Sequence, residues 1–201
     1  MSLCGGEAEL AGYFASGGGV MWPLAGLSVW AWSLILLKGG QLASWRRTEL
    51  PAEDAVAAAL DGQDLQGWQG DMAREFLALR TGDSELDSKL LHRLSHRHGD
   101  AAMRGVGTII VFAGLAPLLG LLGTVTGMIG AFDALAAWGT GNPRALSGGI
   151  SEALVSTQTG LLVAIPALFA GHFLRRRAQT LHDRMERFCT ALARGATQEA
   201  A

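Results

Sequence analysis

Charge is scarce in this 201-residue chain, because only 17% of its residues are Asp, Glu, Lys or Arg, against about 25% in a typical soluble domain. The 18 acidic and 16 basic residues nearly cancel, to a formal net charge of −2, so the charge balance does not favour nucleic-acid binding. Cysteine is also scarce, with only Cys4 and Cys189 in the sequence. The sequence shows no nucleophile–base pair, phosphate-binding loop or complete metal motif, so we expect neither an enzyme nor a bound cofactor.

The missing charges are concentrated in three stretches. Residues 10–37 and 105–132 carry none, and residues 153–174 contain only His172 as a titratable group. About 20 helical residues cross a hydrocarbon core of about 30 Å. We therefore predict an all-α membrane protein whose transmembrane helices cover 20–38, 105–138 and 147–174 of the sequence. The second and third helices are expected to extend into the cytoplasm, the second as one continuous helix.

The distribution of Lys and Arg predicts the orientation in the bilayer, because cytoplasmic loops collect these residues. The tail 1–19 has none, residues 38–104 have nine, the turn 139–146 has one and the C-terminal helix 175–201 has six. We expect the tail and the turn to be periplasmic and the loop and the C-terminus to be cytoplasmic. Trp22 and Trp138 then fall near the outer interface, where indole rings are enriched. The first ten residues resemble no cleavable signal peptide.

The loop 39–104 is expected to be helical. Pro51 and the two acids that follow it suit a helix start. Ser84 stands three residues before Asp87, which predicts a capping box. In the helix that follows, Leu86, Leu90 and Leu94 would share one face.

Three histidines, His92, His96 and His98, raise the question of a metal site in this loop. His92 and His96 are four residues apart and would share a helical face. No acid or thiol completes a ligand set beside them, so a solvated helix face is favoured over a metal site.

Small residues recur at four-residue spacing in the second and third spans, as Gly123, Gly127, Ala131, Gly160 and Ala164. Such residues let helix backbones approach closely in lipid, so we predict that these faces pack against neighbouring helices, including other copies of the chain. Pro117 and Pro166 are expected to kink these spans, either as hinges or as accommodations of packing.

Glu152 is an isolated acid at the start of an apolar run. A carboxylate at the bilayer centre costs on the order of 3 kcal/mol and usually marks a functional site. Glu152 lies only about 8 Å along its helix, however, so an acid that reaches interfacial water is the alternative. Asp133, within two turns of the outer apex, is expected at the interface.

Four hydroxyl side chains accompany Glu152 in a predicted polar patch. With Trp138 as the apex of a hairpin, Thr124 and Glu152 are equally far from it and lie at similar depth. Ser156 and Thr159 fall within about 40° of Glu152 on the helical wheel, and Thr157 lies about 140° away. Such a patch suits a water-lined proton or ion path, whereas hydroxyls that only bond to their own backbone are the alternative.

The segments APLLGLLGTVTGMIGAF (116–132) and GGISEALVSTQTGLLVAIPAL (148–168) resemble the MotA/TolQ/ExbB proton-channel family, most closely its ExbB members. GGGVMWPLAGLSVWAWSLILL (17–37) is similar to the family's first span. The resemblance implies a homopentameric ring in the bacterial inner membrane, around a pore that holds a dimer of ExbD. It also implies that protons are the coupling ion and that the complex energises TonB for the import of siderophores or vitamins.

Residue by residue, the resemblance places the family's pore glutamate on Glu152 and its pore threonines on Thr124 and Thr157. It therefore favours Thr157 over the Ser156 and Thr159 of the helical wheel. Three spans argue against a four-span MotA stator. A TolQ-like subunit that drives TolR and TolA in outer-membrane constriction, and a passive scaffold for ExbD and TonB, remain alternatives.

Overall fold

A computed structural model of the chain describes residues 12–139 and 143–199. All regular elements in these residues are helices, as predicted. They are, in chain order, α2 (Met21–Arg47), α3 (Ala52–Leu60), α4 (Trp68–Leu79), α5 (Ser84–Met103), α6 (Val106–Trp138) and α7 (Pro143–Glu199). Three helical stretches are long and apolar enough to cross a membrane, which confirms that prediction: Met21–Arg47, Glu85–Ala137 and Leu146–Ala196.

The helices form two compact units. One, which we call the spanning unit, contains Thr108–His172 and the described part of Met1–Ile35. The other, which we call the loop unit, contains Leu36–Gly107 and the described part of Phe173–Ala201. Since α2 and α7 each contribute residues to both units, the units are not consecutive segments of the chain.

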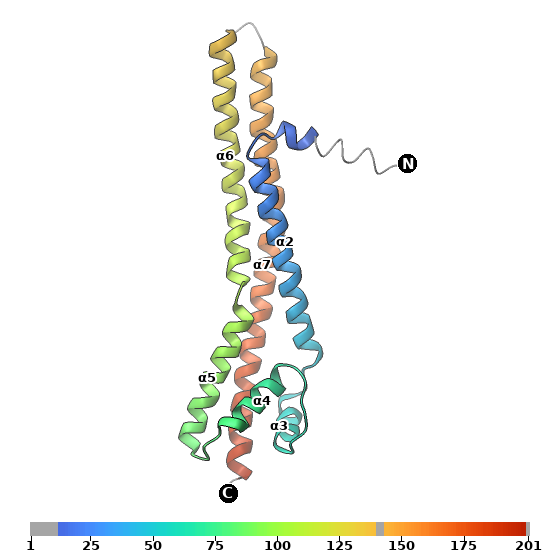
Figure 1. Cartoon of the computed structure of the whole chain (residues 1–201), viewed down its shortest axis with the longest axis vertical. Coiled ribbons are helices and arrows are strands. Elements are labelled where there is room, and N and C mark those ends of the chain that lie inside the picture. The colour runs from blue at the N-terminus through green and yellow to red at the C-terminus, as the bar shows by residue number, and fades with distance from the viewer. Residues whose placement is uncertain (1–11, 140–142, 200–201) are drawn as a thin grey trace, which may run out of the picture. The chain divides into compact units, whose positions relative to one another are not determined.

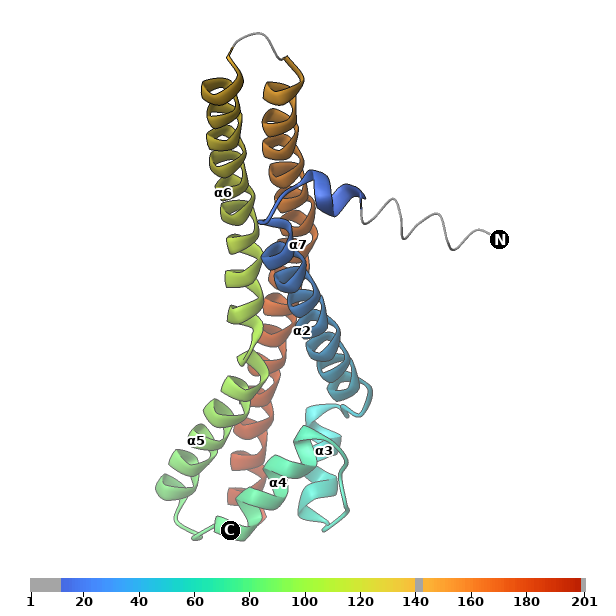
Figure 2. The ribbon, with the colours of Figure 1, turned by 45° about the horizontal axis from the view of Figure 1, so that its top comes forward.

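In the spanning unit, α6 lies antiparallel beside the first part of α7, and the first part of α2 packs against the pair (Figures 1 and 2). The buried side chains are mainly small, such as Ala116, Ala131 and Ala164, whereas large apolar side chains point outward: Leu118 is 60% exposed and Phe169 is 75% exposed. Apolar surface on this scale marks contact with lipid or with other subunits.

Glycines set the distance between α6 and α7. A Cβ atom added to Gly160 would lie 2.8 Å from the carbonyl oxygen of Ala116, and one added to Gly127 would lie 2.9 Å from that of Gly149. Real Cβ atoms essentially never come this close to backbone, so these positions exclude any side chain. The two backbones are therefore in direct contact, which is how helices associate where lipid removes the hydrophobic drive.

The residues predicted for helix packing lie in this α6–α7 contact. Gly123 faces Ser156, Ala131 lies against Gly149, and Gly160 lies against Gly120. Ala164 is buried with Met21 and Leu24 of α2, so it contacts the first span as well. Both helices continue through Pro117 and Pro166.

The loop unit has a core of large side chains, unlike the spanning unit. Helices α3, α4 and α5 surround the last part of α7 (Figure 1). The rings of Trp68 and Phe188 meet edge to face with their centroids 5.6 Å apart. Buried side chains from α4 and α7 complete the core, among them Met72, Phe76, Met185 and Leu192.

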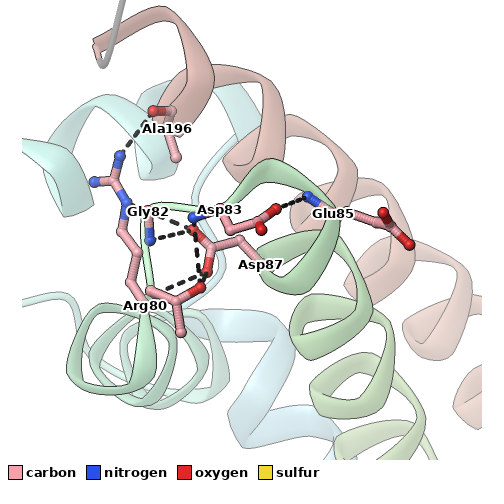
Figure 3. Close-up of polar contacts among 7 residues, drawn as sticks. Arg80, Gly82, Asp83, Glu85, Asp87 and Ala196 are labelled. Carbon is pink, nitrogen blue, oxygen red and sulfur yellow. Dashed lines mark hydrogen bonds and ion pairs between the residues drawn. The ribbon is translucent and has the colours of Figure 1, made fainter.

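The loop between α4 and α5 corrects the predicted capping box. The N-cap of α5 is Asp83, whose side chain accepts a hydrogen bond from the backbone N–H of Glu85 (Figure 3). Asp87 turns back to the loop instead, where it accepts hydrogen bonds from the N–H and hydroxyl of Thr81 and from the N–H of Gly82. A carboxylate of the first turn is thus used to hold the preceding loop.

The apolar face of α5 also differs from the prediction. Leu94 and Leu91 are buried, whereas Leu86 is 52% exposed. Since Asp87 occupies the inward position of the first turn, the buried face begins there and leaves Leu86 outside.

The helix ends differ from the predicted spans at two places. Helix α2 runs nine residues past position 38, to Arg47. Helix α7 already begins at Pro143 and continues without a break to Glu199. The second span is one continuous helix, α6, and it begins directly after Gly105, whose φ of +85° is a conformation that favours glycine. Residues 1–11, 140–142 and 200–201, which include much of the predicted tail and turn, lie outside the described residues.

Candidate functional site

Glu152 lies in the third turn of α7 and is half-buried. Its carboxyl group packs directly against Gly18, in the short segment that leads into α2: a Cβ atom on Gly18 would collide with Oε1 of Glu152. Gly18 also has a φ of +69°. The backbone conformation favours glycine at position 18, and a larger residue there would also displace the Glu152 side chain from this position.

The segment 13–18 covers a wider part of this face of α7. The hydroxyl groups of Tyr13 and Thr159 are hydrogen-bonded at 2.8 Å. A Cβ atom on Gly17 would lie 3.2 Å from Cγ1 of Val155. We call the surface formed by Glu152, Val155 and Thr159 the Glu152 face. It brings together two of the predicted site residues, Glu152 and Thr159.

Sequence reasoning missed Tyr13 and Gly18 as parts of this site. Tyr13 is the only tyrosine of the chain, and Gly18 is the centre of a run of three glycines. Both are therefore unusual in composition. Their contacts cross more than 130 positions of sequence, which no local pattern can reveal.

Ser156 and Thr157 turn toward α6 instead of the Glu152 face. Ser156 is fully buried against Gly123 and donates a hydrogen bond to the carbonyl oxygen of Ala153. The hydroxyl of Thr157 lies 3.0 Å from the same carbonyl oxygen and 3.3 Å from that of Gly120 on α6. The patch predicted from the helical wheel is thus divided between two faces of α7.

Thr124 lies near the depth of Glu152 on the opposite helix. Gly123 faces Ser156 and Gly127 faces Ala153, so Thr124 is level with the turn that follows Glu152. Its hydroxyl donates to the carbonyl oxygen of Leu121 at 2.6 Å. Within the described residues, no hydrogen bond joins Thr124 to Glu152.

The chemistry available here is that of one acid among hydroxyls. Each hydroxyl can donate its proton to a helix carbonyl and still accept a hydrogen bond from water. In the part of the chain that the structure describes, the Glu152 carboxyl group receives no hydrogen bond and no ion pair from another side chain. Within these residues, its oxygen atoms are left to water or to a donor on another molecule.

Comparison with known proteins assigns the chain to a family. Residues 67–187, more than half of the chain, match the MotA/TolQ/ExbB proton channel family. The chain belongs to this family. It is a family of proton channels and not of enzymes, and its members work in complexes of several subunits.

Several proteins similar to this chain carry the name ExbB. The chain is 34% identical over 125 residues to the biopolymer transport protein ExbB of Xanthomonas campestris, across 62% of this chain and 47% of that protein. It is 34% identical over 171 residues to a putative ExbB-like protein of Synechocystis, and the match covers 77% of this chain and 66% of that protein. For ExbB of Salmonella typhimurium the identity is 28% over 176 residues, and the match covers 79% of this chain and 72% of that protein. The chain spans about half the length of the Xanthomonas relative.

Among solved structures, the MotAB complex of C. jejuni matches with a TM-score of 0.46 and 24% identity, over 94% of this chain and 69% of that one. This level of similarity adds nothing to the family assignment.

The other polar residues that the sequence analysis considered, Asp133 and the histidines, do not belong to the Glu152 face. Asp133 is exposed near the end of α6. His92 and His96 are exposed on α5 with their rings 4.5 Å apart, and His182 of α7 lies beyond them, 5.8 Å from His96. Across the described residues, no group of three or more His, Cys, Asp or Glu side chains is placed to hold a metal ion.

Proposed function

We propose that this chain is the channel-forming subunit of a proton-driven energiser in the bacterial inner membrane. With an ExbD-type partner it would use the proton motive force to energise TonB for the import of siderophores or vitamins. The observation that carries the proposal is Glu152, an acid within the apolar α6–α7 hairpin that receives no donor from the described part of its own chain. Membership of the proton-channel family supports it.

The energetics of Glu152 favour a partner outside the chain. An ionised carboxylate within a bilayer costs on the order of 3 kcal/mol, and no basic side chain of the spanning unit's described residues offsets this cost by an ion pair. Water, a proton or a donor on a second molecule would. We therefore assign Glu152, Thr124 and Thr157 to the wall of a pore, beside the ExbD dimer, and Ser156 and Thr159 to its immediate surroundings.

The outward surfaces of the hairpin support an assembly around such a pore. Leu121, Val125 and Leu161 are each about half exposed or more, so these faces of α6 and α7 are available to other copies and to lipid. We propose a homopentamer in which protons are the coupling ion, with the N-terminus in the periplasm and the C-terminus in the cytoplasm.

The test is the substitution Glu152→Gln in cells that depend on this protein for TonB-dependent uptake. We expect uptake to fall at least tenfold, because the amide keeps the shape of the side chain but cannot exchange a proton. Asp133→Asn removes an exposed acid from the other helix of the hairpin and should leave uptake within twofold of wild type.

A loss of uptake reports on Glu152 only if the Glu152→Gln protein still assembles with its partner. Purification with the partner followed by native mass spectrometry should show five copies of either protein. Normal uptake with Glu152→Gln would contradict the motor role and leave a passive scaffold. Loss of outer-membrane constriction with intact uptake would instead identify a TolQ-like subunit acting through TolR and TolA.

A further inference from the structure

A groove of about 340 Å³ lies in the loop unit, between the last turns of α2 and the part of α7 that follows the third apolar run. Four arginines and one glutamate contribute to its walls, together with apolar side chains: Arg46, Glu49, Arg176, Arg177, Arg184, Leu42 and Phe173. Positive charge therefore exceeds negative charge within a confined space. The groove is far along α7 from Glu152, and the proposed channel function makes no use of it.

Two of the four arginines have partners within the groove. Arg184 forms an ion pair with Glu49 at 2.7 Å, which neutralises the one acid present. The guanidinium carbon of Arg177 lies 4.4 Å from the centroid of the Phe173 ring, which is a cation–π contact. These contacts give the groove a defined wall.

Arg46 and Arg176 are the other two. Both are exposed, and neither guanidinium group makes a hydrogen bond or ion pair with a residue that the structure describes. Each guanidinium group presents five N–H donors and matches the geometry of a phosphate group. Since the two positive charges repel each other, an anion bound between them would be stabilised.

The apolar side of the groove indicates which anion fits. Phe173 is 55% exposed and stands near the end of the uncharged run, two residues before Arg175. The groove thus begins where the third apolar stretch gives way to charge, at the level of lipid headgroups. A free phosphate ion would use the arginines and leave Phe173 uncovered, whereas a phospholipid would use both. Basic clusters next to transmembrane helices attract anionic lipids.

We propose that this groove binds the phosphate of an anionic phospholipid of the phosphatidylglycerol class, with an acyl chain lying over Phe173. The lipid would belong to the leaflet at the basic ends of the spans. It would join α2 to α7 within one subunit by bridging Arg46 and Arg176.

The experiment is native mass spectrometry of the full-length protein in a mild neutral detergent, titrated with phosphatidylglycerol or with phosphatidylcholine. We expect tighter binding of phosphatidylglycerol, because phosphatidylcholine has no net charge. The double variant Arg46→Gln/Arg176→Gln should bind phosphatidylglycerol at least tenfold more weakly, since each basic residue near an anionic headgroup contributes about fivefold in affinity. Arg175→Gln/Arg187→Gln removes the same charge from exposed positions of α7 outside the groove and should stay within twofold of wild type.

Two further measurements identify the occupant. Soluble glycerol phosphate should compete weakly, and Phe173→Ala should weaken binding of the lipid but not of this headgroup. The proposal is overturned if the two lipids bind with equal affinity, or if glycerol phosphate binds as tightly as the lipid. It is also overturned if Arg175→Gln/Arg187→Gln loses as much affinity as Arg46→Gln/Arg176→Gln. A last outcome against the proposal is that the Arg46→Gln/Arg176→Gln protein dissociates into monomers in lipid-free detergent. That result would assign the groove to a second copy of the chain.

Discussion

Asp87 is a single carboxylate that organises the loop between two helices. It is buried, accepts hydrogen bonds from Thr81 and Gly82, and lies 3.9 Å from Nε of Arg80. The guanidinium of Arg80 in turn donates to the carbonyl oxygen of Ala196 on α7 at 2.8 Å (Figure 3). One acid thus connects the α4–α5 loop to the C-terminal part of α7.

These contacts predict a pH-dependent loop. The backbone hydrogen bond from Thr81 is the main cause that lowers the pKa of Asp87 below its ordinary value of 3.8, against an opposing effect of burial. A lowered pKa means that the carboxylate stabilises the folded state fully above pH 3.8, and that this contribution is lost as the pH falls through the lower, folded-state pKa. At pH 7 we therefore expect Asp87→Asn to raise amide hydrogen exchange in residues 81–87 severalfold.

The ratio of exchange rates in the variant and in wild type should approach one as the pH falls below that pKa. Glu85→Gln, which changes an exposed acid two residues away in the same turn, should show a ratio near one at every pH. A ratio for Asp87→Asn that does not change with pH would refute the role of the charge.

At the scale of helices, the close contact of α6 and α7 depends on glycines that have no room for a side chain. Gly127 is opposed by backbone atoms of Gly149 and Ala153, whereas no atom lies within 4 Å of a Cβ added to Gly130 in the same helix. Backbone atoms cannot rotate away as a flexible side chain can, so a larger residue at position 127 must push the helices apart.

The resulting prediction compares Gly127→Val with Gly130→Val. Overpacking of a tight contact costs about 1–3 kcal/mol, so we expect Gly127→Val to lower the midpoint of thermal unfolding in detergent by several degrees. Gly130→Val should change it little. Equal effects of the two substitutions would mean that valine itself, and not the contact, is responsible.

The sequence predicted this contact in part. Four-residue spacing identified Gly123, Gly127 and Gly160, but not Gly149, since the run of small residues on α7 includes the polar Ser156. A helical wheel gives angles between residues of one helix and not the direction in which the helix faces. It therefore grouped Ser156 with Glu152, although Ser156 faces α6. The second span was predicted to begin at residue 105, because the charged residues of the loop end at Arg104, and the break at Gly105 lies at this boundary.

At the scale of the whole molecule, the two units have cores of different kinds. The spanning unit packs backbone against backbone, and the loop unit buries large side chains such as Phe188, Phe76 and Leu192. Close backbone contact is typical of helices surrounded by lipid. The core of the loop unit is instead stabilised by the removal of apolar surface from water.

This difference predicts separate responses to mutation. Phe188→Ala should destabilise the loop unit by about 3–5 kcal/mol, the usual cost of emptying a buried aromatic site. We expect hydrogen exchange to increase across α3, α4 and α5 but not in residues 113–131 of α6. Leu79→Ala, at a side chain that is 53% exposed, serves as the control. Loss of protection in both units with Phe188→Ala would show that they unfold together.

The glycine contact between α6 and α7 also limits how this protein can move. Small residues repeat along both helices about every four positions, so an equivalent fit recurs only after a shift of one helical turn, about 5.4 Å. A shorter shift would move Ala131 and Ala153 away from the glycines that they face, Gly149 and Gly127, so sliding of one helix along the other is opposed. In the proposed assembly, motion powered by protons would therefore occur at the outward faces of the hairpin and not within it.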